Sequence, residues 1–422
     1  MEKFFTFCRC GRSHSLARRA GARSYRPCVR PAPIGWGSAL GCFPHCGNKF
    51  STLWKTCGQR LQAPCRLARQ VNQALLHPRH KAVGVLLLLL SLSACGPVQR
   101  DHSLSGFTMG TTYSVRLADV PLSPKELQQL QTEVDAALEE VNRQMSTYQP
   151  DSEISRFNQA GAEEPILLSA DFHSVMQLAL SIASATDGAF DPTVGALVNL
   201  WGFGPDRSER QHPTDAQIEA ARQTVGWRHL GLTDDGQLVK DIPLLYLDLG
   251  AIAKGFGVDK VAGLLRDHDL ENFLVEIGGE TLGVGHNADG VPWRVGVMLP
   301  DFRPESDLQG IVHLSGGRAI ATSGDYQNYF LDEEGRVRSH IIDPRTAAPV
   351  PHTVASVSVL ANDCTTADAL ATALTVLGPD EGLPLLETRF PGVEALFILR
   401  VSEDQFKEVS TPSFTDALQY EH

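Results

Sequence analysis

The chain has 422 residues, of which 42% are hydrophobic and 20% are charged, and its formal net charge is −12. This balance excludes a disordered or collagen-like chain. Residues 1–81 hold 15 of the 37 basic residues but only one of the 49 acidic residues, so the rest of the chain carries a net charge of −26. With this net negative charge, residues 82–422 offer no basic surface to neutralise phosphates, which argues against nucleic acid as a partner.

The first 70 residues are rich in Cys, Arg and Pro and show neither a helical nor an alternating hydrophobic period. Seven of the nine cysteines lie in this stretch, at positions 8, 10, 28, 42, 46, 57 and 65. We therefore predict that residues 1–76 lie outside the folded protein, as an unstructured extension or as the product of a mis-assigned start codon. N-terminal mass spectrometry that finds these residues in the protein would contradict a mis-assigned start.

A targeting segment is predicted at residues 77–94. A basic flank, His77-Pro78-Arg79-His80-Lys81, precedes an apolar run at 82–92 that contains five consecutive leucines. This order is typical of a signal peptide, and the run is too short to span a bilayer as a mature helix. The small residues before Cys95 resemble a bacterial lipobox, which implies cleavage before Cys95 and its lipidation. We expect a lipid anchor at the periplasmic face of the bacterial inner membrane, with 95–105 as a linker; a short buried helix is the alternative.

Residues 106–402 read as one α+β domain, followed by a charged tail at 403–422. A capping box from Ser123 to Glu126, with apolar residues at helical spacing after it, predicts a first helix. Further helices are expected from about Ser169 and from Thr214. Short apolar, β-branched runs bounded by Gly or Pro predict strands at 244–249, 273–277, 294–299, 311–314, 354–360 and 395–399. This order favours an α+β fold with a mixed sheet and flanking helices, in one lobe or two, over a doubly wound sheet.

A glycine-rich connection at residues 248–257 links a predicted strand to a helical pattern. Such a turn offers backbone amides and a helix N-terminus to an anion, and the positive charge of Lys254 suits phosphate. The spacing matches neither a dinucleotide fingerprint nor a Walker loop. The alternative is a tight strand-to-helix connection with a solvated lysine.

Asp368 and Thr372 lie four residues apart on a helix predicted over residues 363–377. Both oxygens therefore project from one helix face. A carboxylate and a hydroxyl are hard ligands that suit Mg²⁺ and not zinc or copper. An Asp–Thr hydrogen bond on an exposed helix face is the alternative.

Four further segments carry polar side chains at turns: an acidic turn at 187–192, a Gly-Gly turn at 276–280, a polar turn at 323–326, and residues 340–345, where a His, an Asp and an Arg lie close together. Each segment alone also fits an ordinary turn, and a lone histidine is more often structural than catalytic. Together with the phosphate-binding turn and the hard metal ligands, they indicate chemistry on a phosphoanhydride.

Seven blocks in order between residues 106 and 399 resemble the ApbE family of FAD:protein FMN transferases. The blocks are Thr108-Met109-Gly110-Thr111-Thr112-Tyr113, Met145-Ser146-Thr147-Tyr148, Gly188-Ala189-Phe190-Asp191-Pro192-Thr193-Val194, Leu247-Asp248-Leu249-Gly250-Ala251-Ile252-Ala253-Lys254-Gly255, Ala321-Thr322-Ser323-Gly324-Asp325-Tyr326, His340-Ile341-Ile342-Asp343-Pro344-Arg345-Thr346 and Thr366-Ala367-Asp368-Ala369-Leu370-Ala371-Thr372. Members of this family are often exported lipoproteins, which agrees with Cys95.

The resemblance implies Mg²⁺-dependent cleavage of FAD, with transfer of FMN to a Thr or Ser hydroxyl of an acceptor protein and release of AMP. It implies His340 as the catalytic residue, and it places the metal on Asp368, Thr372 and the backbone carbonyl of Ala251. It implies FAD contacts at Met109, Tyr148, Ala189, Phe190, Asp191, Asp248, Lys254 and Ile341. The acceptors that it implies are membrane redox proteins that carry covalent FMN.

Ala347 departs from the family pattern, which usually has Gly at this position. If the turn requires a positive φ, Ala347 lowers stability or shifts the loop that carries His340. Two other functions stay open: an exported FAD pyrophosphatase that yields FMN and AMP, and a flavin-binding lipoprotein without turnover. A positioned base would activate the acceptor hydroxyl, and either His340 or a nearby acid fits that role.

Overall fold

The computed structural model describes residues 101–204, 213–300, 308–324, 329–331, 337–350, 353–402 and 405–420. The predicted extension, signal peptide and lipidated Cys95 lie outside these residues. Residues Gly96–His422 form one compact unit, without a division into two lobes. In the described part of this unit, no helix is long and apolar enough to cross a membrane.

The centre of the domain is an eight-stranded sheet with the order β1-β2-β6-β7-β10-β15-β16-β17. Its strands are β1 (His102–Thr108), β2 (Thr111–Leu117), β6 (Phe273–Ile277), β7 (Glu280–Val284), β10 (Ala319–Gly324), β15 (Val354–Ala361), β16 (Glu394–Ser402) and β17 (Gln405–Ser410). The α+β class is confirmed, but each neighbouring pair in this sheet is antiparallel, so the sheet is not mixed. The β1–β2 and β6–β7 pairs are hairpins with two-residue turns, a connection that only antiparallel strands allow.

Smaller sheets surround this centre. They comprise β3 (Ile166–Leu167), β5 (Gln237–Lys240) and β4 (Leu230–Leu232); β18 (Leu418–Gln419), β9 (Leu308–Leu314) and β8 (Trp293–Met298); and the pairs β11 (Tyr329–Leu331) with β12 (Val337–Ser339) and β13 (Ile342–Asp343) with β14 (Ala348–Pro349). The strands predicted at 294–299 and 311–314 correspond to β8 and the end of β9.

The three predicted helix starts are confirmed. Ser123, Ser169 and Thr214 are N-caps whose side chains accept backbone hydrogen bonds, and Ser123 and Thr214 form complete capping boxes. The helices are α4 (Pro124–Met145), α5 (Glu153–Gln159), α6 (Ala170–Ala185), α7 (Gly195–Leu200), α8 (Asp215–Arg222), α9 (Ala253–Asp267), α10 (Cys364–Arg389, kinked at Gly378) and α11 (Pro412–Ala417).

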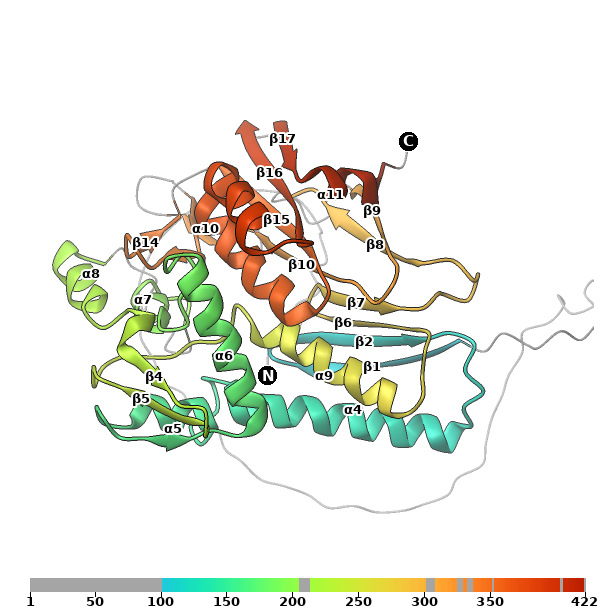
Figure 1. Ribbon diagram of the computed structural model, residues 1–422, viewed down its shortest axis with the longest axis horizontal. Helices are drawn as coiled ribbons and strands as arrows, with labels where there is room; N and C mark the ends of the chain where they lie inside the picture. Colours follow the sequence, from blue (N-terminus) through green and yellow to red (C-terminus); the bar gives the residue numbers. More distant parts are fainter. Residues whose placement is uncertain are drawn as a thin grey trace, which may run out of the picture. The chain divides into compact units, whose positions relative to one another are not determined.

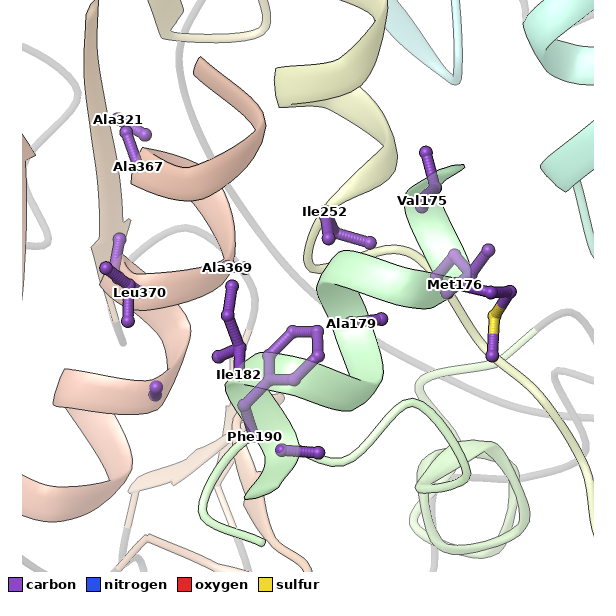
Figure 2. Packing of buried hydrophobic residues seen from close by; sticks show 14 of the residues in the cluster. Val175, Met176, Ala179, Ile182, Phe190, Ile252, Ala321, Ala367, Ala369 and Leu370 are labelled. Atoms are coloured by element: carbon purple, nitrogen blue, oxygen red, sulfur yellow. The ribbon is translucent and has the colours of Figure 1, made fainter. Parts of the chain in front are cut away.

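Both faces of the main sheet are covered, which explains its almost continuous apolar strands. On β6, Val275 packs with residues of α4 and α9 on one face, while Leu274 packs with β9 and α11 on the other. Figure 1 shows α4 and α9 beside β1, β2 and β6, and α10 beside β10 and β15. The third part of the core lies between α6 and α10, where Figure 2 shows the side chains of Ile182 and Phe190 next to Ala369.

Four predictions need correction at the level of single elements, and three of them concern the tail, the linker and a turn. The described part of the predicted tail, residues 405–420, belongs to the fold, because β17 extends the main sheet and the buried Phe414 of α11 closes its second face. The predicted linker at 95–105 contains the first residues of β1. Residues 323–324 end strand β10 instead of forming a turn, and residues 325–326 lie outside the described chain.

The strand predicted at 244–249 does not form. Its only strand-like pairing among the described residues is a single parallel bridge from Tyr246 to Val194. Leu247 is held instead by a side chain: Asn158 donates to its carbonyl at 3.0 Å and accepts from its N–H at 2.7 Å. The amide of Asn158 thus replaces a neighbouring strand, which no local hydrophobic pattern could reveal.

Candidate active site

A cavity of about 800 Å³ opens where the β1–β2 turn, the ends of α4 and β10, the turn before β7, and the starts of α9 and α10 meet. All twelve site residues predicted within the domain line this one cavity. They are Met109, Tyr148, Ala189, Phe190, Asp191, Asp248, Ala251, Lys254, His340, Ile341, Asp368 and Thr372. The fold therefore brings together residues from six separate parts of the sequence, while their individual roles remain predictions.

The turn between β1 and β2 directs Met109 into the cavity. Met109 and Gly110 both have positive φ, 48° and 75°, as a two-residue hairpin turn requires. The turn imposes this conformation although it is unfavourable for Met, and the Met109 side chain lines the cavity. Asn142 of α4 fixes this turn by donating to the Thr108 hydroxyl at 3.0 Å. Tyr148, beyond the end of α4, is 64% exposed and stands among the cavity-lining residues.

Asp191 anchors the loop that carries Ala189 and Phe190. Its carboxylate accepts hydrogen bonds from the Thr193 backbone N–H at 2.8 Å, the Thr193 hydroxyl at 2.6 Å and the Trp227 backbone N–H at 3.0 Å. Burial raises the pKa of Asp191, and these hydrogen bonds oppose the rise. Because Thr193 and Trp227 engage both carboxylate oxygens, Asp191 shapes the cavity wall as well as lining it.

Asp248 lies in the extended segment that Asn158 holds. Its backbone N–H donates to the Pro192 carbonyl at 2.9 Å, and its carboxylate accepts from the Gly250 N–H at 2.8 Å. Burial raises the pKa of Asp248, with the Gly250 hydrogen bond acting against it. This turn sets the direction of the chain into α9, whose first residues carry Lys254.

Lys254 lies between two buried carboxylates. Its ammonium nitrogen is 2.9 Å from Glu280 Oε1 and 3.5 Å from Asp368 Oδ1. Burial lowers the pKa of Lys254, but the two carboxylates outweigh burial and the net shift is upward, so the lysine stays charged. Burial raises the pKa of Glu280 to about 7, although the Lys254 ammonium lowers it. The predicted phosphate-binding lysine is therefore part of a charged cluster and is not a solvated side chain.

The oxygens predicted to hold the metal suit a hard cation. The Gly255 N–H, which in a regular helix would donate to the Ala251 carbonyl, donates to Asp368 Oδ2 at 2.9 Å instead. Among the described residues none is hydrogen-bonded to the Thr372 hydroxyl. A carboxylate, a hydroxyl and a backbone carbonyl match the ligands that Mg²⁺ takes. The described residues contain no group of three or more His, Cys, Asp or Glu side chains placed to bind a metal, and this set has a single carboxylate.

His340 stands between β12 and β13, with the ring of Phe203 edge-on at 6.3 Å. The other polar residues of its block are structural: Asp343 accepts from the Arg345 backbone N–H at 2.9 Å and from its guanidinium at 3.0 and 3.1 Å. Ala347 has φ of 60°, so this turn does require the left-handed conformation for which Gly is suited. The Ala347 carbonyl accepts from the buried Trp201 indole at 3.1 Å, which ties the turn to α7.

Sequence reasoning missed Glu280, Asn142 and Thr322 as site residues, although all three line the cavity. Glu280 gave a weak signal, since it follows a Gly-Gly turn that ends a buried strand. Asn142 gave none, because a polar residue at the end of a long amphipathic helix is ordinary.

Comparison with known proteins agrees with this geometry. The sequence pattern described as the ApbE family matches residues 109–397. A FAD:protein FMN transferase of Vibrio cholerae serotype O1 is 46% identical over 329 residues, which cover 78% of this chain and 96% of that protein. One from Haemophilus influenzae is 42% identical over 304 residues, which cover 71% of this chain and 87% of that protein.

Solved structures show the same fold. The structure of the flavin transferase ApbE from Vibrio cholerae has a TM-score of 0.69 at 45% identity and covers 76% of this chain and 100% of its own. The apo form of the flavinyl transferase ApbE from Pseudomonas stutzeri has a TM-score of 0.68 at 36% identity, covering 77% and 98%. Fold and cavity thus define an α+β protein with an acidic, glycine-rich ligand site. The chain belongs to the ApbE family.

Proposed function

We propose that this protein is an FAD:protein FMN transferase. It cleaves the pyrophosphate of FAD, joins FMN through a phosphoester to a Thr or Ser hydroxyl of an acceptor protein, and releases AMP. The observation that carries the proposal is the convergence of all twelve predicted residues on one cavity, in a chain that is similar to such transferases over most of their length.

The chemistry is a phosphoryl transfer in which positioning and charge neutralisation matter most. The acceptor oxygen forms a bond to the FMN phosphorus, and the bond between that phosphorus and the bridging oxygen breaks. AMP leaves with the bridging oxygen and its electron pair, while the acceptor hydroxyl gives its proton to a base. We assign this base to His340, the one histidine among the described residues that lines the cavity. A positioned base contributes roughly 10²–10⁴-fold to such a step.

Lys254, at the start of α9, would receive the pyrophosphate, because its positive charge favours an anion there. We propose that Asp368, Thr372 and the Ala251 carbonyl hold Mg²⁺, which supplies positive charge to the pyrophosphate and to the leaving AMP. Tyr148, Met109 and Phe190 offer the apolar surface that suits the flavin rings.

We further propose that the protein is exported and lipid-anchored through Cys95 at the periplasmic face of the inner membrane, where its acceptors would be flavin-carrying subunits of membrane redox complexes. The support is the signal-like segment before Cys95. Membrane attachment would place the cavity near such acceptors.

The test uses purified protein with FAD, Mg²⁺ and a candidate acceptor, following AMP release and the acceptor's mass. We expect stoichiometric AMP and an FMN-sized adduct, both lost in Asp368→Ala. Asp380→Ala is the matched control, because Asp380 is an exposed carboxylate on the same helix and lies outside the cavity.

Two other outcomes would replace the proposal. AMP without an adduct, with several acceptors tried, indicates an FAD pyrophosphatase that uses water as the nucleophile. Bound FAD without any AMP indicates a flavin-binding protein. Loss of activity in both Asp368→Ala and Asp380→Ala would remove the support for Asp368 as a metal ligand.

A further inference from the structure

Glu280 is a buried acid beside the predicted metal site to which the activity assigns no task. It is the first residue of β7, after the turn formed by Gly278 and Gly279, and its side chain is 4% exposed. Its Oε1 accepts from Lys254, while its Oε2 is buried without a hydrogen-bond partner among the described residues. A buried charge with an unused oxygen is costly for stability, which indicates that the carboxylate is retained for function.

The position of Lys254 gives that function a physical reason. The ammonium lies 2.9 Å from Glu280 but 3.5 Å from Asp368 Oδ1, so it is held closer to Glu280. Asp368 Oδ2 is already used by the Gly255 N–H at 2.9 Å, so Oδ1 is the oxygen left for a cation. An ammonium and a divalent cation repel each other and cannot share one carboxylate oxygen at bonding distance.

A lysine side chain is flexible and, without a second partner, would settle on the nearest carboxylate. Here that carboxylate is Asp368. We propose that Glu280 is a positioning residue that draws the Lys254 ammonium away from Asp368 and so keeps Asp368 Oδ1 available to the divalent cation. The inference rests on the metal site of the proposed function and adds a residue that sets its cation affinity.

The test measures cation binding directly, in the full protein without FAD, by the loss of the free Mn²⁺ signal in electron paramagnetic resonance. Mn²⁺ serves as the probe because it prefers the same oxygen ligands as Mg²⁺. We expect Glu280→Gln to weaken Mn²⁺ binding at least tenfold. Glu271→Gln is the matched control, because Glu271 is an exposed glutamate just before β6 and lies outside the cavity.

Removing the lysine separates positioning from direct ligation. If Glu280 acts through Lys254, the double variant Lys254→Met/Glu280→Gln regains most of the affinity, because no ammonium remains to occupy Asp368. If binding stays weak in the double variant, Glu280 is itself a ligand and the proposal is wrong. Unchanged binding in Glu280→Gln also overturns it.

The conservative variant Glu280→Asp separates positioning from charge alone. It keeps the negative charge but shortens the side chain by one methylene, so its carboxylate no longer reaches the ammonium at 2.9 Å. We expect binding at least threefold weaker; binding as tight as that of the wild type would overturn the positioning role. If Asp368→Asn binds Mn²⁺ as tightly as the wild type does, the proposed metal site and this inference are both wrong. Circular dichroism on each variant confirms that it is folded.

Discussion

The contact between α9 and α10 gives the sharpest test of how the site is built. Gly255 lies in the first turn of α9, and a Cβ added to it would lie 2.3 Å from the Cys364 carbonyl oxygen and 2.8 Å from Asp368 Cβ. These atoms belong to the first turns of α10, where no flexible side chain could move aside. Gly255→Ala therefore forces the two helices apart at the point where Gly255 donates to Asp368.

The expected loss of stability has two parts. Overpacking a tight core contact costs about 1–3 kcal/mol. Losing a hydrogen bond to a charged carboxylate costs about 1.5–3 kcal/mol. We expect Gly255→Ala to lower the free energy of unfolding by about 3 kcal/mol or more, and to weaken Mn²⁺ binding because Asp368 moves with α10.

Urea unfolding followed by circular dichroism measures this loss, and α9 offers an internal control. Gly263 lies on the same helix with nothing within 4 Å of an added Cβ, so Gly263→Ala gains only helix propensity, about 0.5–1 kcal/mol. The two substitutions should therefore change the free energy of unfolding in opposite directions. If Gly255→Ala is as stable as the wild type, the close approach of the helices does not position Asp368, and the reasoning is refuted.

Three further predictions follow from single contacts. Asn158→Ala leaves the backbone N–H and carbonyl of Leu247 unpaired, so it should lower both stability and FAD affinity, measured by unfolding and by flavin fluorescence; intact FAD affinity would contradict a positioning role. Ala347→Gly relieves a left-handed φ, which is worth about 1–2 kcal/mol. It also removes a buried methyl group and makes the unfolded chain more flexible, so the free energy of unfolding should change by less than about 1 kcal/mol. A larger gain in stability would show that the methyl group contributes little. Burial raises the pKa of Glu280 from 4.5 to about 7, so between these pH values the folded state binds a proton that the unfolded state does not. The contribution of this group to stability therefore falls as the pH rises from 4.5 to 7. Glu280→Gln should lose less stability than the wild type between pH 5 and pH 8, and an equal loss would contradict the assignment.

Several local features of the fold could be predicted from the sequence because they are encoded in short-range patterns. Ser123, Ser169 and Thr214 cap helices through hydrogen bonds within three residues, so local sequence is enough to place them. Asp368 and Thr372 are paired by the helical repeat alone. The departure from the family's Gly at Ala347 raised the question of a positive φ, and the structure shows that φ is 60° there.

The errors in the predicted elements share one cause. The apolar run at 244–249 has the composition of a strand, but its backbone partner is a side-chain amide 89 residues away in the sequence. The described part of the charged tail, residues 405–420, shows no clear period because few of its residues are buried, among them Phe414 and Leu418. A local sequence pattern shows which residues are apolar, but it does not show which residues they contact in the fold.

The sequence by itself predicted the twelve residues that line the cavity, because they stand in short blocks whose side-chain types and order resemble those of the family. Only the tertiary structure decided how the set is arranged. Glu280 is 26 residues from Lys254, and Gly255 is 113 residues from Asp368, yet each pair is joined at 2.9 Å. The balance of charge around Lys254, and with it the availability of Asp368, depends on the packing of β7, α9 and α10 against one another, because electrostatic interactions in a buried site follow distance in space and not position along the chain.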